Sequence, residues 1–256
     1  MKTKNIIVNA LFLMLVGSQT MLAQKMVVTL TNNQVVKYDV SEVKEVTFEK
    51  PIEHEWVDLG LPSGTLWATM NVGAENPEDY GDYFAWAETT GYKGNKTEFD
   101  WLTYKYCNNG DMGLLTKYCT DGTFGKVDYK KEIEATDDAA TVYWGSSWQI
   151  PSLEQIQELI SAQNVKVTKT ALNGVVGIKI ASLTNNNSIF LPAAGCRETR
   201  TVDFGSYGAY WSRSLAVNNN PYAYIMEFWT TSASPSTGTV DSARCIGRCI
   251  RPVRKK

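Results

Sequence analysis

The sequence predicts an α+β domain in which one or two helices pack on short antiparallel strands joined by long loops. The first observation is a helical pattern over residues 152–160, and the second is a series of short apolar runs after it. Turns rich in Asn, Gly and Ser separate these runs, and helices followed by many strands are typical of the α+β class. The predicted strands cover residues 165–168, 174–181, 188–192, 210–211, 222–228 and 249–253.

Residues 1–23 have the features of an export signal. Lys2 and Lys4 precede an apolar run over residues 6–16, and residues 21–24 form a plausible cleavage site. The run is shorter than the roughly 20 apolar residues that cross a bilayer, and no later stretch is apolar enough to cross one. We expect an exported chain without a transmembrane segment, which is secreted, periplasmic or held at the cell surface.

A small β appendage is predicted for residues 24–50. Two alternating strands flank the pair Asn32 and Asn33, and residues 41–48 suggest a helical turn and a third strand. A piece of this size is too small to be stable alone without docking. The main domain is therefore expected at residues 55–254.

Local signals support the helix and its surroundings in the main domain. Ser152 and Gln155 have the spacing of a capping box, and the apolar positions that follow form one face. Trp144 and Trp148 are expected to fill the corner beside this helix. Residues 89–135 show no sustained period, which predicts an irregular insertion.

Charge and composition exclude nucleic-acid binding. Without Lys2 and Lys4 the chain has 23 basic and 27 acidic side chains, a net charge of −4. Its basic residues cluster only in the tail at residues 248–256, which we interpret as a solvated terminus rather than a phosphate-binding face. With 43% hydrophobic residues, the chain can bury one sizeable core.

Five cysteines in an exported chain favour disulfides, and their odd number leaves at least one unpaired. Cys107 and Cys119 could close the loop between them. Cys245 and Cys249 lie four residues apart on one expected strand, roughly 13 Å, too far to bond each other. If either is bridged, Cys196 is the natural partner. The spacing matches no standard zinc site.

Few residues could support catalysis. His54 is the single histidine and lies in the link before the domain, where an exposed role is expected. Asp82, Glu88 and Glu227 could converge as paired carboxylates, but no spacing singles them out. The Asn-rich turn at residues 218–221 does not by itself supply the ligands of a hard cation. We therefore predict no catalytic residues, no cofactor and no metal.

Several segments, taken in order, resemble a family of secreted bacterial proteins called the major paralogous domain group. The matching segments are Trp56 to Val72, Tyr80-Gly-Asp-Tyr-Phe-Ala-Trp-Ala-Glu88, Asp137 to Leu159, and Leu191 to Arg254 with its Tyr210-Trp-Ser and terminal Arg-Pro-Val. This resemblance implies a C-type-lectin-like fold, related to formylglycine-generating enzymes and to the variable proteins of diversity-generating retroelements. The calcium-binding Glu-Pro-Asn and Trp-Asn-Asp motifs of animal lectins are missing, so the resemblance favours metal-independent binding.

In the variable relatives, ligands bind between the Tyr-Trp-Ser segment and the terminal Arg-Pro-Val. Along residues 224–229, alternation assigns Tyr224, Met226 and Phe228 to the core and the intervening side chains to an exposed face. In the alternative, Trp229 covers a loop and Ile225 packs on the insertion. The resemblance thus implies these ligand-binding candidates: Arg213, Leu215, Tyr222, Ile225, Glu227, Trp229, Ile246 and Arg248.

The resulting hypothesis is a non-enzymatic, adhesin-like protein that binds a protein or carbohydrate ligand through its C-terminal strands and loops. An enzyme remains the first alternative, either of the formylglycine-generating type with Cys245 and Cys249 or a hydrolase with two carboxylates. The cysteine spacing departs from that enzyme pattern. A structural or fimbrial subunit, whose N-terminal strands pair with another chain, is the second alternative.

Overall fold

The chain divides into two units, one at residues 1–51 and the other at residues 52–256. The computed structural model describes residues 25–29, 34–46, 53–198, 201–202, 205–231 and 236–254. The predicted export signal at residues 1–23 lies outside the described residues.

The first unit contains an antiparallel hairpin. Strand β1 (Lys25–Thr29) pairs with β2 (Val35–Asp39), with Val27 opposite Lys37, and a 3-10 turn, η1 (Val40–Glu42), follows. The two strands and the helical turn match the prediction, but residues 43–46 form no third strand. Val28 is the single buried residue among the described part of this unit. The hairpin thus has almost no core of its own.

The second unit is mostly β, and the predicted α+β class is wrong. Its two α-helices, α1 (Ala139–Trp144) and α2 (Leu153–Leu159), have only six and seven residues. The helical signals were real but local, because each helix ends after about two turns. All pairings between the strands are antiparallel, in the sheets β13-β4-β3, β5-β6-β7, β8-β9 and β10-β11-β12.

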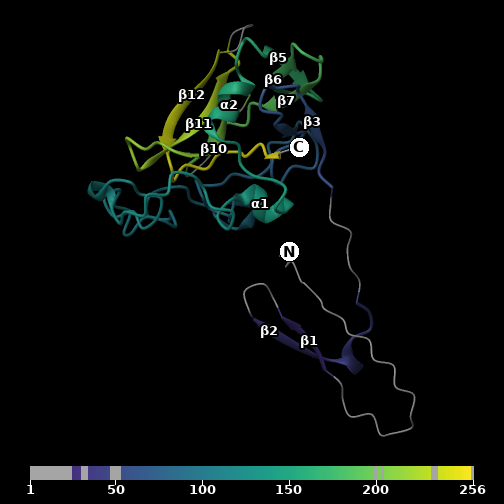
Figure 1. Ribbon diagram of the computed structural model, residues 1–256, viewed down its shortest axis with the longest axis vertical. Coiled ribbons are helices and arrows are strands. Elements are labelled where there is room, and N and C mark those ends of the chain that lie inside the picture. Colours follow the sequence, from purple (N-terminus) through teal and green to yellow (C-terminus); the bar gives the residue numbers. More distant parts are fainter. Residues whose placement is uncertain are drawn as a thin grey trace. The chain divides into compact units, whose positions relative to one another are not determined.

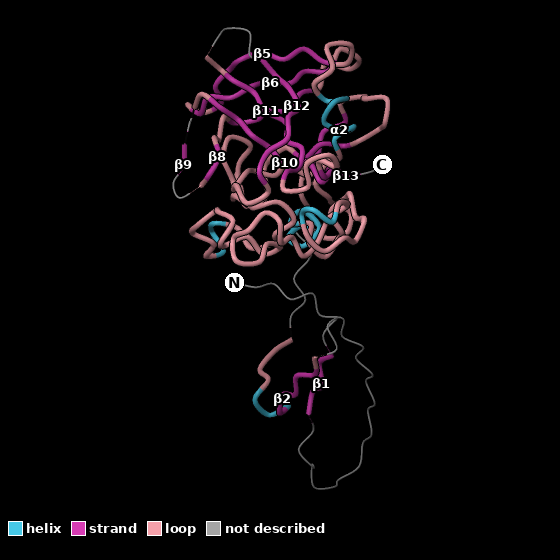
Figure 2. The backbone as a smooth tube through the Cα atoms, turned by 90° about the vertical axis from the view of Figure 1, so that its left-hand side faces the viewer, coloured by secondary structure: helices cyan, strands magenta, loops and turns pink. Residues whose placement is uncertain are grey.

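The strands of this unit have the following bounds: β3 Trp56–Asp58, β4 Leu66–Ala68, β5 Val165–Leu172, β6 Val175–Ser182, β7 Ser188–Pro192, β8 Cys196–Arg197, β9 Thr201–Val202, β10 Tyr207–Leu215, β11 Tyr222–Trp229, β12 Ser236–Ala243 and β13 Val253–Arg254. Helix α2 packs against the β10-β11-β12 sheet (Figure 1). The irregular segments, including the predicted insertion at residues 89–135, form a loop layer along one side of the strands (Figure 2).

Helix α2 begins where the sequence predicts. The Ser152 hydroxyl accepts the backbone N–H of Gln155, and the Gln155 side chain accepts the backbone N–H of Ser152, which satisfies two N–H groups at the helix start. Ile156 and Leu159 are buried on its inner face. Trp144 and Trp148 pack edge to face beside α1, with ring centroids 5.1 Å apart.

His54 is not the exposed linker residue that we predicted. Its imidazole stacks on the Trp144 indole, with ring centroids 3.7 Å apart, and is half-buried. Burial lowers the pKa of His54, so the stacked imidazole stays neutral near pH 7. This contact attaches the start of the second unit to the α1 corner.

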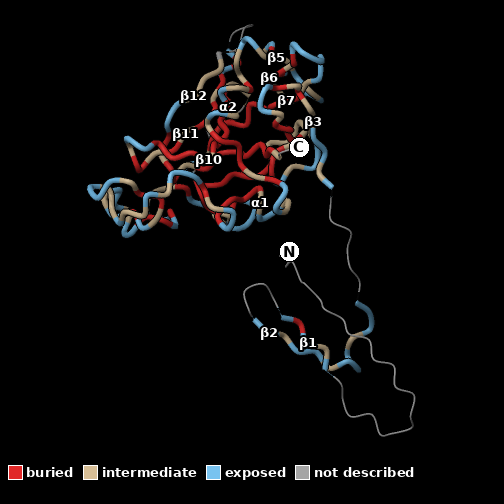
Figure 3. Tube along the Cα trace, in the orientation of Figure 1, coloured by how far each residue is buried: buried red, intermediate tan, exposed pale blue. Residues whose placement is uncertain are grey.

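The core joins segments that are far apart in the sequence. The Trp211 indole donates a 2.7 Å hydrogen bond to the Phe84 carbonyl, and the Trp86 indole donates one of 2.8 Å to the Ser212 carbonyl. Two of the motifs that carry the family resemblance therefore contact each other directly inside the protein. Buried residues are concentrated around β10 (Figure 3).

Within the described residues, the arginines Arg248 and Arg251 of the basic tail are buried rather than solvated. Arg251 is 1% exposed and Arg248 is 7% exposed. The Arg251 guanidinium donates hydrogen bonds to Asn71 Oδ1 and to the carbonyls of Ala68 and Thr69. These acceptors lie about 180 residues away in the sequence, so the sequence pattern of the tail could not reveal them.

Candidate functional site

The candidate site is a face of the β10-β11-β12 sheet near the end of β11. Tyr207 of β10 lies opposite Trp229 of β11, and Trp211 lies opposite Ile225. Because side chains two residues apart point to the same side of a strand, Glu227 shares this face. We call Tyr207, Glu227 and Trp229 the aromatic face.

The two rings of the aromatic face are packed together. Their centroids are 4.4 Å apart, with an angle of 35° between the ring planes. Tyr207 is 7% exposed, whereas 39% of Trp229 is exposed. The buried tyrosine thus supports an indole whose outer surface faces solvent.

A carboxylate completes this face. The Tyr207 hydroxyl donates a 2.8 Å hydrogen bond to Glu227 Oε2. Burial raises the pKa of Tyr207 to about 12, against a lowering effect of the Arg248 charge, so the hydroxyl keeps its proton at neutral pH. The bond fixes the half-buried Glu227 side chain and commits one of its two oxygens, which leaves Oε1 for another donor.

Arg248 lies further along the same face. Its guanidinium is 5.6 Å from the centroid of the Trp211 ring, and its Nη2 donates to the Ser242 hydroxyl. Within the described residues, Nε and Nη1 of Arg248 have no hydrogen-bond partner. The arginine therefore covers the Trp211 ring, and its positive charge lies close enough to Tyr207 to oppose the rise in the pKa of that hydroxyl.

The structure brings four predicted residues to this face: Ile225, Glu227, Trp229 and Arg248. Ile225 is 1% exposed, so the prediction that it faces solvent is wrong. Its cross-strand neighbour Trp211 is covered by Arg248 and by the backbone at Phe84. Alternation assigns side chains to two faces of a strand but does not reveal what covers each face.

The other four predicted residues lie elsewhere. Arg213 forms an ion pair of 2.8 Å with Glu132 and donates to Gln149 Oε1. Leu215 is buried in the core. Ile246 is half-buried and packs against the edge of the same core. Tyr222 lies five positions before Glu227 on β11, so alternation along the strand points its side chain to the other face.

Tyr207 and Ser242 are the site residues that sequence reasoning missed. Both belong to neighbouring strands, and their contacts depend on the register of β10 and β12 against β11. The alternating pattern of Tyr207, Ala209 and Trp211 indicates a shared face, but no local signal specifies which residues of another strand lie opposite.

Two of the carboxylates that could have formed a catalytic pair have structural roles. Asp82 accepts the backbone N–H groups of Tyr83 and Lys93, and burial raises its pKa. Glu88 forms a 3.1 Å ion pair with Lys96 and accepts the Lys105 N–H.

Across the part of the chain that the structure describes, no group of three or more His, Cys, Asp or Glu side chains could hold a metal ion.

The cysteines form no disulfide with one another, although all five are buried. The predicted Cys107–Cys119 bond and the predicted pairing of Cys196 with Cys245 or Cys249 are therefore not formed. Burial raises the pKa of Cys245 to about 12 and also raises that of Cys249. Thiols with such pKa values stay protonated and are weak nucleophiles at neutral pH.

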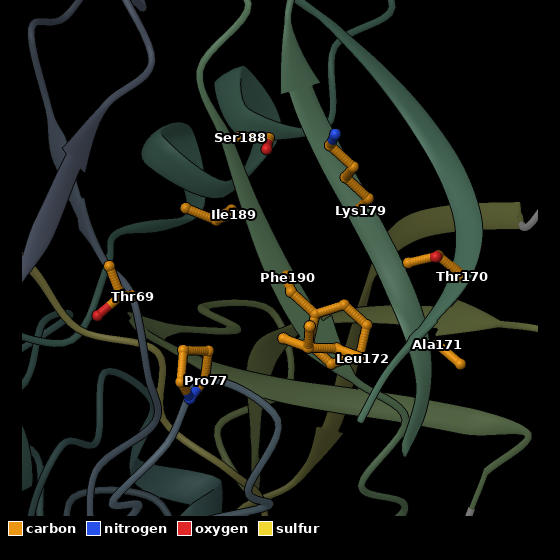
Figure 4. A pocket seen from close by; sticks show the side chains of 9 residues that line it. All are labelled: Thr69, Pro77, Thr170, Ala171, Leu172, Lys179, Ser188, Ile189 and Phe190. Carbon is orange, nitrogen blue, oxygen red and sulfur yellow. The ribbon is translucent and has the colours of Figure 1, made fainter. Parts of the chain in front are cut away.

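A separate apolar pocket of about 330 Å³ lies on the β5-β6-β7 sheet (Figure 4). Leu172, Phe190 and Pro77 supply apolar surface, and Lys179 contributes a charged side chain. None of the predicted ligand-binding residues lines it. The Phe190 ring lies over Gly177, where a Cβ atom would be 2.7 Å from the ring.

Compared with known protein families, curated proteins and solved structures, the chain shows no significant match. In the described residues, no helix combines the length and the apolar character needed to cross a membrane.

Proposed function

We propose that this chain is an exported, non-enzymatic binding protein that recognises a glycan or protein ligand through the aromatic face. The observation that carries the proposal is the exposed Trp229 indole, supported from behind by Tyr207. Resemblance to a family with variable ligand-binding members supports the same region. That resemblance itself remains a prediction.

The chemistry of the aromatic face suits recognition. Packing of the indole against a second ring restricts its rotamers before a ligand binds, which reduces the conformational entropy lost on binding. Its surface can pack on the C–H groups of a sugar ring or on an apolar side chain. Glu227 Oε1 can accept a hydroxyl or amide proton at the edge of the same surface.

The two alternatives have weaker support. For an oxidase of the formylglycine-generating type, Cys245 and Cys249 would have to react as thiolates, and burial opposes this by raising both pKa values. A structural subunit is favoured by one observation. Val27 and Val35 are each about half exposed on a two-stranded hairpin, which could pair with a strand of another chain.

The test is a screen of glycan and protein arrays with the exported chain, repeated with Trp229→Ala. We expect the substitution to weaken binding of any specific ligand by about 30-fold or more, as for a central contact residue. Trp56→Ala is the matched control, since Trp56 is 45% exposed on β3 outside the aromatic face, and it should bind normally. Specific binding that survives Trp229→Ala would contradict the proposal, and so would the failure of every array ligand to bind.

A further inference from the structure

A second concavity lies apart from the aromatic face, between the loop at residues 73–83 and strand β8. Its volume is about 470 Å³, within the range of small-molecule sites, about 300–1,000 Å³. Three tyrosines, Tyr80, Tyr83 and Tyr92, line it together with Lys93 and Arg197. None of the three residues of the aromatic face lines this pocket.

Arg197 is the central group of this tyrosine pocket. Its guanidinium lies 3.4 Å from the centroid of the Tyr92 ring and 5.4 Å from that of Tyr83. The Nε of Arg197 is buried without a hydrogen-bond partner, and no described carboxylate forms an ion pair with the guanidinium. A stacked guanidinium keeps its donors in the plane of the group, where they can reach a ligand.

The surrounding residues hold this arrangement in place. The Tyr92 N–H donates to the Tyr83 carbonyl at 3.0 Å, and the Tyr83 hydroxyl donates to the Ala194 carbonyl at 2.7 Å. On the other side, the Arg197 N–H donates to the Gly247 carbonyl at 2.8 Å. The tyrosines and the arginine are therefore positioned before any ligand binds, which reduces the entropy cost of binding.

The acidic groups of the pocket leave the charge of Arg197 available. Asp79 uses its carboxylate on its own loop, because Oδ2 accepts the backbone N–H groups of Glu75 and Asn76. Glu75 is exposed at the rim. Lys93 adds a second cation, and its Nζ donates to the Gly73 carbonyl at 2.8 Å. An anionic group is thus the partner that the Arg197 donors lack.

We propose that the tyrosine pocket binds a sugar that carries a carboxylate. The carboxylate would accept paired hydrogen bonds from the planar guanidinium of Arg197, a geometry that Arg provides and Lys does not. The sugar ring would contact the tyrosine rings, and the Tyr92 hydroxyl can bond to a sugar hydroxyl. The proposal concerns a different site from the aromatic face and does not depend on the function proposed for it.

The test is isothermal titration calorimetry of the chain with three probes, galacturonate, galactose and acetate. We expect galacturonate to bind at least about tenfold more tightly than either of the others, because only galacturonate has both the ring and the charge. Arg197→Gln should weaken galacturonate binding by at least about tenfold. Arg254→Gln is the matched control, since Arg254 also stacks on an aromatic ring, 5.5 Å from Trp148, but lies outside the pocket.

Thermal unfolding of each variant shows whether it is folded. If Arg197→Gln does not fold, Tyr92→Leu replaces it, because Tyr92 is 38% exposed and its loss removes the stacking partner of the arginine. Failure of galacturonate to bind, or equal binding of galactose, would overturn the proposal. Acetate binding as tight as galacturonate would refute the role of the sugar ring.

Trp229→Ala separates the two binding proposals. We expect it to leave galacturonate binding unchanged, because Trp229 does not line the tyrosine pocket. If galacturonate binding were lost in Trp229→Ala and kept in Arg197→Gln, the ligand would belong to the aromatic face. That result would refute the tyrosine pocket while supporting the function proposed for the aromatic face.

Discussion

Replacing Arg244 by methionine should destabilise the second unit strongly, although Arg244 forms no ion pair with a described carboxylate. The side chain is fully buried and its guanidinium lies 4.8 Å from the Trp86 ring centroid. It links the insertion to the turn before β11. The four hydrogen bonds that it donates go to the Tyr104 hydroxyl and to the carbonyls of Tyr118, Asn220 and Lys117, at 2.9 to 3.1 Å.

The expected loss of stability is set by the buried carbonyl groups that lose their hydrogen-bond donor. Methionine cannot donate hydrogen bonds, so three carbonyls lose a donor, and each buried unsatisfied group costs about 1–3 kcal/mol. Removal of the arginine also removes the cost of burying its charge, which offsets part of the loss. We therefore expect a decrease near the lower end of the sum, about 3 kcal/mol in the free energy of unfolding. The free energy of unfolding of a typical domain is only about 5–15 kcal/mol, so this loss would be a large fraction of it.

The assay is urea unfolding followed by tryptophan fluorescence, with Arg213→Met as the control. Arg213 is a half-buried arginine whose ion pair with Glu132 is partly exposed, so its loss should cost no more than about 1 kcal/mol. A loss below about 1 kcal/mol for Arg244→Met would refute the argument from unsatisfied carbonyls. An equal loss for both variants would refute it as well.

Two further predictions concern titratable groups. Cys245 and Cys249 should resist thiol reagents at pH 8 in the folded chain and react after denaturation. Burial raises the pKa of both thiols, that of Cys245 to about 12, so neither is a thiolate at pH 8. Peptide mapping that finds either cysteine rapidly labelled in the native state would contradict this prediction. Desolvation alone would raise the pKa of Asp137, but its hydrogen bonds from Lys117 and Tyr118 outweigh burial and lower it below 3.8. Its ionised form therefore adds stability that is present above the unfolded-state pKa and is lost as the pH falls through the folded-state value. In urea unfolding measured from pH 7 to pH 2, Asp137→Asn should lose less stability on acidification than the wild type, and a parallel decrease in both proteins would show that Asp137 contributes nothing.

Local signals predicted individual elements well and the fold class poorly. The Ser152 and Gln155 capping box, the strands at residues 174–181 and 188–192, and the N-terminal hairpin are all present. The α+β class was wrong because a cap and an apolar face indicate where a helix begins, not how much of the chain is helical. The disulfides were predicted from the number of cysteines and the expected compartment, neither of which indicates whether two thiols meet.

Alternation along residues 224–229 depends only on the geometry of a single strand, so the sequence by itself determined that Glu227 and Trp229 share a face. The tertiary structure alone decided that Tyr207 supports Trp229, that Arg248 lies over the Trp211 ring, and that Arg197 lies over the rings of Tyr92 and Tyr83. Each of these contacts joins segments distant in the sequence. Their physical cause is the register of neighbouring strands and the packing of the loops around them, which local patterns do not encode.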